Sequence, residues 1–136
     1  MQAVDAAIYA RLSGDAALQA LVGQRVYRFR APEGAAFPYV VFFKAAGGHR
    51  WTMGRKYYRP MTYVVKAVAE ETAGVDAQTV ACNADERIET LLNDALTVVG
   101  QNVECRRLGD VEYVEDDEPG KQYQHVGGTY RVQLAL

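Results

Sequence analysis

Apolar residues at the start of the chain recur at helical spacing. Between residues 3 and 12 they lie three or four positions apart, which predicts a helix, and Gly14 is expected to end it in a left-handed conformation. Asp15 can then cap a second short helix, AALQALV, that ends at Gly23. The pattern therefore predicts two short helices that cover part of a larger structure.

After Gly23 the pattern becomes that of β-strands, which we predict over 24–29, 38–45 and 60–69, with a loop at 30–38. The segment 38–45, PYVVFFKA, is apolar on both faces, which is typical of a central strand covered by helices. Pro60 is expected to mark a strand start or an edge. One face of this last strand is apolar throughout: Met61, Tyr63, Val65 and Ala67.

The longest helix is predicted to begin after Asp76, a good N-cap residue, and to end within 93–96. Its apolar stripe is Val80, Ala84, Ile88, Leu91 and Ala95. Two closing strands follow over 102–114 and 122–136, and in the second Tyr130, Val132, Leu134 and Leu136 alternate with less apolar residues. We expect the stripe to face the sheet beside Val41, Phe43, Tyr63, Val65, Val132 and Leu134.

The predicted order is α-α-β-β-β-α-β-β, in which strands bracket one long helix. This order favours an α+β fold: an antiparallel or mixed sheet of about four to five strands, with the long helix and the N-terminal helices packed on one face. The chain has 136 residues, 49% of them hydrophobic, which is enough for one core. We predict a single domain over 1–136.

Charge and cysteine content narrow the functional class. The formal net charge is only -2, so the chain as a whole has no strong field for nucleic acid. The first residues lack the basic region of a secretion signal, and no apolar run approaches the ~20 residues that cross a bilayer. Cys82 and Cys105 are too few for a disulfide scaffold, so a reducing cytoplasm is expected.

Side chains with catalytic or ligand chemistry are scattered. The acidic run Glu115–Glu118 lacks the spacing of a calcium loop and precedes Pro119-Gly120, so we interpret it as a solvated hairpin tip. We expect His49 and His125 at a surface or a strand end, and Cys82 and Cys105 as structural thiols. The sequence predicts no enzyme, no cofactor and no metal site.

One stretch, residues 47–59, interleaves bases with aromatic side chains. Arg50 and Trp51 precede Arg55, Lys56, Tyr57 and Tyr58. Such a stretch can form a protein interface, where Trp, Tyr and Arg dominate binding energies, or can bind single-stranded nucleic acid by charge and stacking. It can also be an exposed β-hairpin with ordinary aromatic pairs across its strands.

The charges along the chain are also segregated. No acidic residue lies between Glu33 and Glu70, whereas six bases lie there: Lys44, Arg50, Arg55, Lys56, Arg59 and Lys66. Residues 110–118 hold six acids and no base. The two segments can pair within the fold or head to tail between copies, which is the geometry that closes into a ring. The candidate interface residues are Arg50, Trp51, Arg55, Lys56, Tyr57, Tyr58, Glu115, Asp116, Asp117 and Glu118.

The first third of the chain resembles a known family. The residues that carry the resemblance are Leu21-Val22-Gly23, Arg25-Val26-Tyr27, Pro32 and Phe37-Pro38-Tyr39-Val40-Val41. Together with the order of the later elements, they resemble the tail-completion proteins of long-tailed phages, prophages and gene-transfer agents, also called tail-terminator or tail-to-head joining proteins.

The resemblance implies an α+β fold that assembles as a hexameric ring, caps the finished tail tube and meets the head connector. The implied partners are copies of the chain itself, the tail tube protein and a connector or stopper protein, without a membrane or a specific nucleic acid. It implies a place in the tail or neck of a virion assembled in the bacterial cytoplasm, and neither enzymatic activity nor a cofactor. It assigns no functional residue to the segments 47–59 and 110–118.

Overall fold

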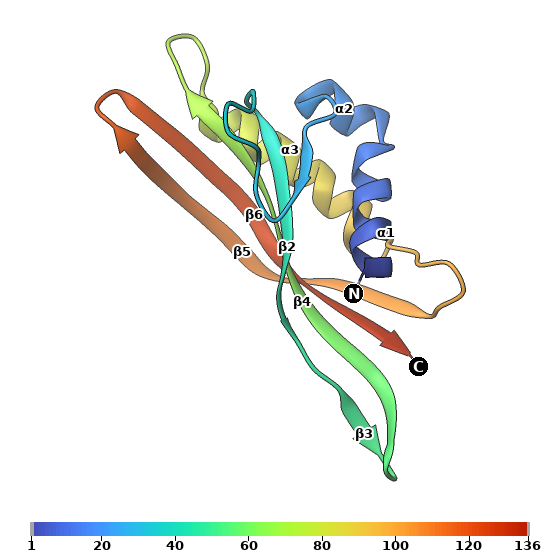
Figure 1. Ribbon diagram of the computed structural model, residues 1–136. Coiled ribbons are helices and arrows are strands. Elements are labelled where there is room, and N and C mark those ends of the chain that lie inside the picture. Colours follow the sequence, from blue (N-terminus) through green and yellow to red (C-terminus); the bar gives the residue numbers. More distant parts are fainter. Residues whose placement is uncertain (1, 136) are drawn as a thin grey trace.

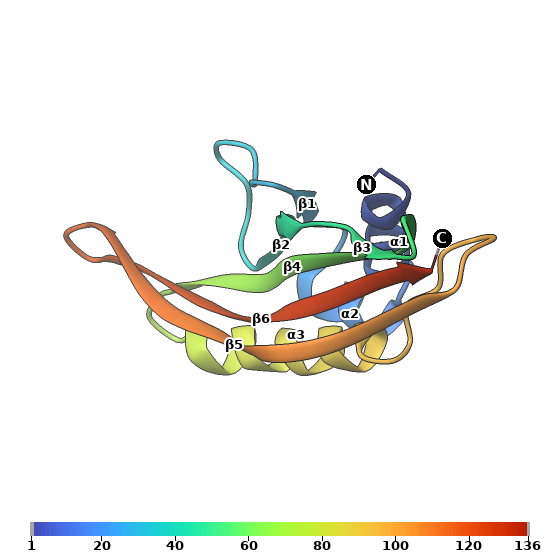
Figure 2. The same ribbon diagram turned by 90° about the horizontal axis from the view of Figure 1, so that it is seen from below.

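The structure, a computed structural model, describes the backbone of residues 2–135 and the side chains of residues 3–50, 53–54 and 59–134. Three helices form a layer on one face of a long, twisted β-sheet (Figures 1 and 2). This arrangement confirms the predicted α+β class. Within the described residues no helix is both long and apolar enough to span a lipid bilayer.

The first two helices are short, as predicted. Helix α1 (Gln2–Ser13) buries Val4, Ile8 and Leu12, and helix α2 (Ala16–Val22) buries Leu18 and Val22. The Asp15 carboxylate accepts a hydrogen bond from the Leu18 backbone N–H at 2.8 Å and so caps α2. Gly23 ends α2 at φ 63°. Gly14 is not in the left-handed region, contrary to expectation; its N–H donates to the Ala10 carbonyl and simply continues the helical turn.

Helix α3 (Ala77–Leu92) is the longest, and Asn93 is its C-cap. Asp76 stands at the N-cap position, but its side chain does not cap the backbone. The Glu71 carboxylate, from the preceding strand, instead accepts the Ala77 N–H at 2.7 Å. A carboxylate at this end also suits the positive end of the helix dipole.

The sheet has six strands: β1 (Val26–Arg28), β2 (Tyr39–Gly47), β3 (Arg50–Thr52), β4 (Arg55–Glu71), β5 (Val103–Glu118) and β6 (Lys121–Ala135). Five of them lie in the order β1-β2-β4-β6-β5, and β3 pairs with the free end of β4. Strand β1 is parallel to β2, and the other pairs are antiparallel. The sheet is therefore mixed.

The core lies between α3 and the sheet. Ala84, Ile88 and Leu91 are buried there with Met61, Tyr63, Val65, Val132 and Leu134, as predicted, while Val80 is half-buried. The prediction for β2 was wrong by one residue, because Val40 and Phe42 face the helices and Val41 and Phe43 face the other way. The helices cover one face of β2 and not both. A strand that is apolar at successive positions carries no alternation from which its register can be inferred.

Pro60 lies inside β4, which begins five residues earlier at Arg55, so the expected strand start was wrong. On one side Pro60 is the register partner of Gln133 in β6. On the other side Pro60 lies in a gap between two pairings of β4. The pairing with β2 ends at Met61, and the pairing with β3 begins at Tyr58. A residue without an N–H is tolerated at such an interruption.

Candidate functional site

The basic-aromatic stretch forms a hairpin that we name the basic arm, residues 47–60. Strand β3 pairs antiparallel with the first residues of β4, and Met53-Gly54 form the turn between Thr52 and Arg55. Both turn residues have positive φ, 53° and 79°, as a two-residue hairpin loop of this twist requires. The Met53 side chain is 95% exposed at the tip, and Arg50 is exposed on β3.

The backbone of the basic arm agrees with the hairpin interpretation of the sequence. Trp51, Arg55, Lys56, Tyr57 and Tyr58, the other candidate interface residues of this arm, lie outside the residues whose side chains the structure describes. Their place in the hairpin comes from the backbone register, which pairs Trp51 with Lys56 and Thr52 with Arg55.

The acidic run forms a second hairpin, which we name the acidic arm, residues 115–122. Strands β5 and β6 continue to Glu118 and Lys121, and Pro119-Gly120 make the turn, with Gly120 at φ 84°. Residues 115–122 are exposed, as expected for a solvated tip. Two of the acids have partners on β6: Glu118 pairs with Lys121 at 2.9 Å and Glu115 with His125 at 2.8 Å.

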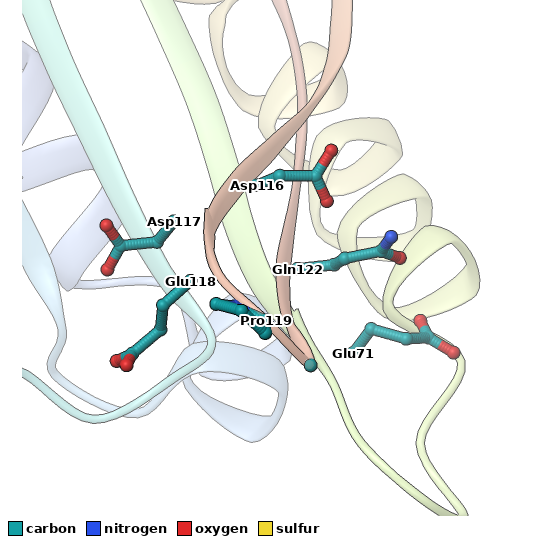
Figure 3. Close-up of a pocket in the computed structure, with 7 residues that line it drawn as sticks. Glu71, Asp116, Asp117, Glu118, Pro119 and Gln122 are labelled. Carbon is teal, nitrogen blue, oxygen red and sulfur yellow. The ribbon is translucent and has the colours of Figure 1, made fainter.

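The acidic arm borders an open hollow of about 560 Å³. Glu71, Gln122 and Asp116 are register partners across β4, β6 and β5, and their side chains point to the same side (Figure 3). Asp117 and Glu118 point to the other side of the arm (Figure 3). The arm therefore presents carboxylates on both of its faces.

The two arms project from opposite ends of the molecule (Figures 1 and 2). Strand β4 is paired with β6 continuously from Tyr58, beside the basic arm, to Glu71, beside the acidic arm. At ~3.3 Å per residue this distance is roughly 40 Å. The Debye length at physiological salt is only ~8 Å, so the arms of one chain do not neutralise each other.

Lys66, one of the six bases between Glu33 and Glu70, has an internal partner in the middle of the sheet. Lys66 donates from Nζ to the Tyr113 hydroxyl at 2.6 Å, and its ammonium lies 5.1 Å from the Tyr113 ring centroid. This contact joins β4 to β5 and belongs to neither arm.

His125 lies within β6, on the face opposite the helices, with only 6% of its surface exposed. The expectation of a surface or strand-end position was therefore wrong for His125, whereas His49 is exposed. Its ring stacks on Tyr113, with centroids 4.3 Å apart, and burial lowers its pKa although the Glu115 hydrogen bond opposes this shift. The histidine stays neutral at pH 7 and fills the sheet face as an aromatic ring.

Three ion pairs that sequence patterns did not reveal connect the layers. Arg107 of β5 binds Asp85 of α3, Arg87 of α3 binds Asp15 at the start of α2, and Arg28 of β1 binds Asp5 of α1. The last pair also includes the Tyr63 hydroxyl, which donates to Asp5 at 2.5 Å. The partners lie 22 to 72 residues apart and leave no periodic pattern in the sequence. These pairs stabilise the helix layer.

The cysteines are free thiols in different surroundings. Cys105 is buried, and burial raises its pKa to about 12. Cys82 is half-buried on α3, where burial and nearby acids raise its pKa. Both thiols are thus protonated at neutral pH, which agrees with a structural role. Among the described residues no three His, Cys, Asp or Glu side chains are grouped so as to hold a metal ion.

Comparison with known families matches residues 6–103 to the family described as tail completion protein gp17. Among solved structures, a chain from the virion of a native gene transfer agent (GTA) particle is similar, with a TM-score of 0.64 and 18% sequence identity. The alignment covers 98% of this chain and 95% of that chain, and at this identity it shows a shared fold. No curated protein sequence matches the chain.

Proposed function

Because the chain belongs to the tail completion protein gp17 family, we propose that it caps the finished tail tube as a hexameric ring and joins the tube to the head connector. Family membership makes the chain a structural component of a phage-type tail. The match over residues 6–103 is the observation that carries the proposal, since it includes most of α1, all of α2 and α3, and strands β1 to β4.

The fold supports a place in a particle. The similar solved chain is part of a gene transfer agent virion. We infer that this chain occupies the tail or neck of a phage, prophage or gene-transfer-agent particle, and that it is assembled in the host cytoplasm. Its partners in this role are copies of itself, the tail tube protein and a connector or stopper protein.

The proposed role requires surfaces that bind other proteins and no chemical reaction. The two arms are hairpins rich in charged residues, and they extend beyond the helix layer at both ends of the sheet (Figure 1). A subunit that must contact neighbours around a ring as well as a tube and a connector needs several such surfaces.

The competing proposal is a single-stranded nucleic-acid binder that uses Arg50, Trp51, Lys56 and Tyr57. Tight binding of a labelled oligonucleotide that weakens steeply with salt would favour this competitor. A ring function predicts weak binding instead, because the net charge of the chain is -2 and its bases are concentrated on one arm.

The direct test is assembly on tail tubes. The purified protein is mixed with tubes built from the tail tube protein of the same particle, and the mixture is examined by negative-stain electron microscopy and native mass spectrometry. The proposed function predicts one ring at one end of each tube and a complex with the mass of six chains. Tubes that remain bare at both ends, with the protein at the mass of one chain, would contradict the function.

A further inference from the structure

Resting on the ring proposed above, we infer that the basic arm of one copy binds the acidic arm of the next copy. The partner that binds the acidic arm is thus a second copy of this chain. The inference follows from three features of the described residues: the separation of the arms, the charges that lack internal partners, and the shape of the acidic arm.

Separation excludes pairing inside one chain. The arms lie at opposite ends of the sheet, roughly 40 Å apart along β4. Each copy therefore offers one basic and one acidic surface in different places. Contacts between unlike surfaces are head to tail, and such contacts form a ring when the rotation between neighbours closes.

Most acids of the segment 110–118 have internal partners. Asp110 pairs with Arg107, Glu112 accepts a hydrogen bond from Gln78, and Glu115 and Glu118 pair with residues of β6 as described above. Asp116 and Asp117 form no ion pair or hydrogen bond with a described side chain. These two carboxylates are the ones available to a neighbour.

Two described bases toward the other end also lack internal partners. Arg50 and Lys44 are exposed and form no ion pair with the described side chains. Arg55 and Lys56 flank the turn of the same hairpin by register. No acid lies between Glu33 and Glu70, so the basic arm has no acidic neighbour in sequence either.

The acidic arm also has a shape that a hairpin can enter. Its hollow of about 560 Å³ is lined by Glu71, Asp116–Gly120 and Gln122. The Glu71 carboxylate is engaged with the Ala77 N–H, which leaves Asp116 as the free anion of the row in Figure 3. A guanidinium can donate two parallel hydrogen bonds to such a carboxylate, and this geometry fixes the register of the partner.

Burial of apolar surface supplies the rest of the contact. Exposed ion pairs each contribute only ~0–1 kcal/mol and mainly steer docking. The tip of the basic arm carries Met53, whose side chain is 95% exposed in the single chain. In the proposed contact, the acidic arm of the next copy covers this side chain.

The experiment reverses each arm separately. One variant carries Asp116→Lys and Asp117→Lys, and the other carries Arg55→Glu and Lys56→Glu. Each variant alone then places like charges opposite each other at the substituted positions, so we expect its fraction of rings at ~0.1 M salt to fall at least about tenfold, with or without tail tubes. Native mass spectrometry measures the fraction.

Mixing the two variants in equal amounts provides the decisive measurement. In an alternating ring the residues at positions 55 and 56 again face residues of opposite charge at positions 116 and 117 at every interface, and a ring of six subunits permits alternation. We expect the mixture to recover rings to within about twofold of the unmodified chain. Recovery also shows that both variants are folded, so loss of folding cannot imitate the effect.

Two matched controls change net charge equally but away from the arms. Glu33→Lys with Glu86→Lys matches the first variant, and Arg30→Glu with Arg106→Glu matches the second; all four positions are exposed. Both controls should assemble like the unmodified chain.

The remaining outcomes show whether the contact between arms fails alone or together with the proposed ring. Rings that form equally well with either arm reversed, or a loss that mixing does not restore, would overturn the contact between arms and leave the cap function standing. Failure of the unmodified chain to associate, with and without tail tubes, would overturn the arm contact and the ring together.

Discussion

The Arg107 guanidinium donates to both carboxylate oxygens of Asp85, each at 2.9 Å, and so fastens strand β5 to helix α3. About nine-tenths of each side chain is buried, with 10% of Arg107 and 11% of Asp85 exposed. The same guanidinium also donates to Asp110 and to the Gly127 carbonyl. The pair holds the edge strand of the acidic arm to the helix layer.

Replacement of one partner should destabilise the fold more than replacement of both. Arg107→Met leaves the Asp85 carboxylate buried without its counter-ion, for which we expect a loss of about 3–5 kcal/mol in the free energy of unfolding. Adding Asp85→Leu removes the unpaired charge and should recover part of the loss. Urea denaturation of the single and double variants measures both values; additive losses would show that the two residues are not coupled.

Truncation of Ile88 tests the packing of α3 on the sheet. Ile88 is fully buried, and Ile88→Ala removes apolar contacts and leaves a cavity, so a loss of about 2–5 kcal/mol is expected. Thr90→Ala on the exposed side of α3 is the control and should change stability by less than ~0.5 kcal/mol. Similar small losses at both positions would mean that α3 is rotated about its axis.

A methyl group at Gly127 should not be tolerated. A Cβ atom there would lie 2.2 Å from the Val65 carbonyl oxygen, and this backbone atom cannot move without breaking the pairing of β4 with β6. We expect Gly127→Ala to cost at least about 1–3 kcal/mol in thermal or urea unfolding. Gly48→Ala, where nothing lies within 4 Å and φ is not positive, should be nearly neutral.

Acid should weaken the contact between α2 and α3. The Arg87 hydrogen bond lowers the pKa of Asp15 to about 2, from 3.8. The folded chain holds this carboxylate ionised where the unfolded chain protonates it, so its stability contribution is present above about pH 4 and is lost as the pH falls to about 2.

Asp15→Asn keeps a cap residue but removes the charge, so it should lower stability at pH 7 and flatten this acid response. Arg87 is 35% exposed, and screening reduces the expected loss at pH 7 to about 1–2 kcal/mol. Unfolding curves between pH 2 and 7 make the comparison; an unchanged acid response in the variant would contradict the assignment.

His125 should make the stability of the fold depend on pH nearer to neutrality than Asp15 does. Burial lowers its pKa from 6.5, so the unfolded chain binds a proton before the folded chain does and stability falls as the pH drops below about 6.5. His125→Phe keeps a ring to stack on Tyr113 and removes the titration. A variant whose stability still falls over this interval to the same extent would show that another group is responsible.

Local pattern was sufficient for most of the elements. Alternation in β4 identified Met61, Tyr63 and Val65 as one buried face, and the three- and four-residue spacing placed Ile88 on the inner side of α3; both predictions are confirmed. Asp15 was identified as a cap because a cap depends on residues only three positions apart. These features are local, so the sequence alone carries them.

Pattern was insufficient wherever a position depends on a distant partner. The register of β2 was missed because Val40 to Phe43 are all apolar, and only packing against the helices distinguishes Val40 and Phe42 from Val41 and Phe43. Arg107 and Asp85 are 22 residues apart, and neither residue type predicts burial until the sheet and α3 are brought together.

Some features of the two arms follow from the sequence, and others follow only from the tertiary structure. The sequence by itself determined the helical and strand segments, the family resemblance and the segregation of bases from acids, because each of these is a property of nearby residues. Tertiary structure alone decided that the two charged segments lie at opposite ends of the molecule, since the paired length of β4 and β6 holds them apart. Screening in water makes charges at that separation independent, and for this reason we propose that the arms bind other copies of the chain.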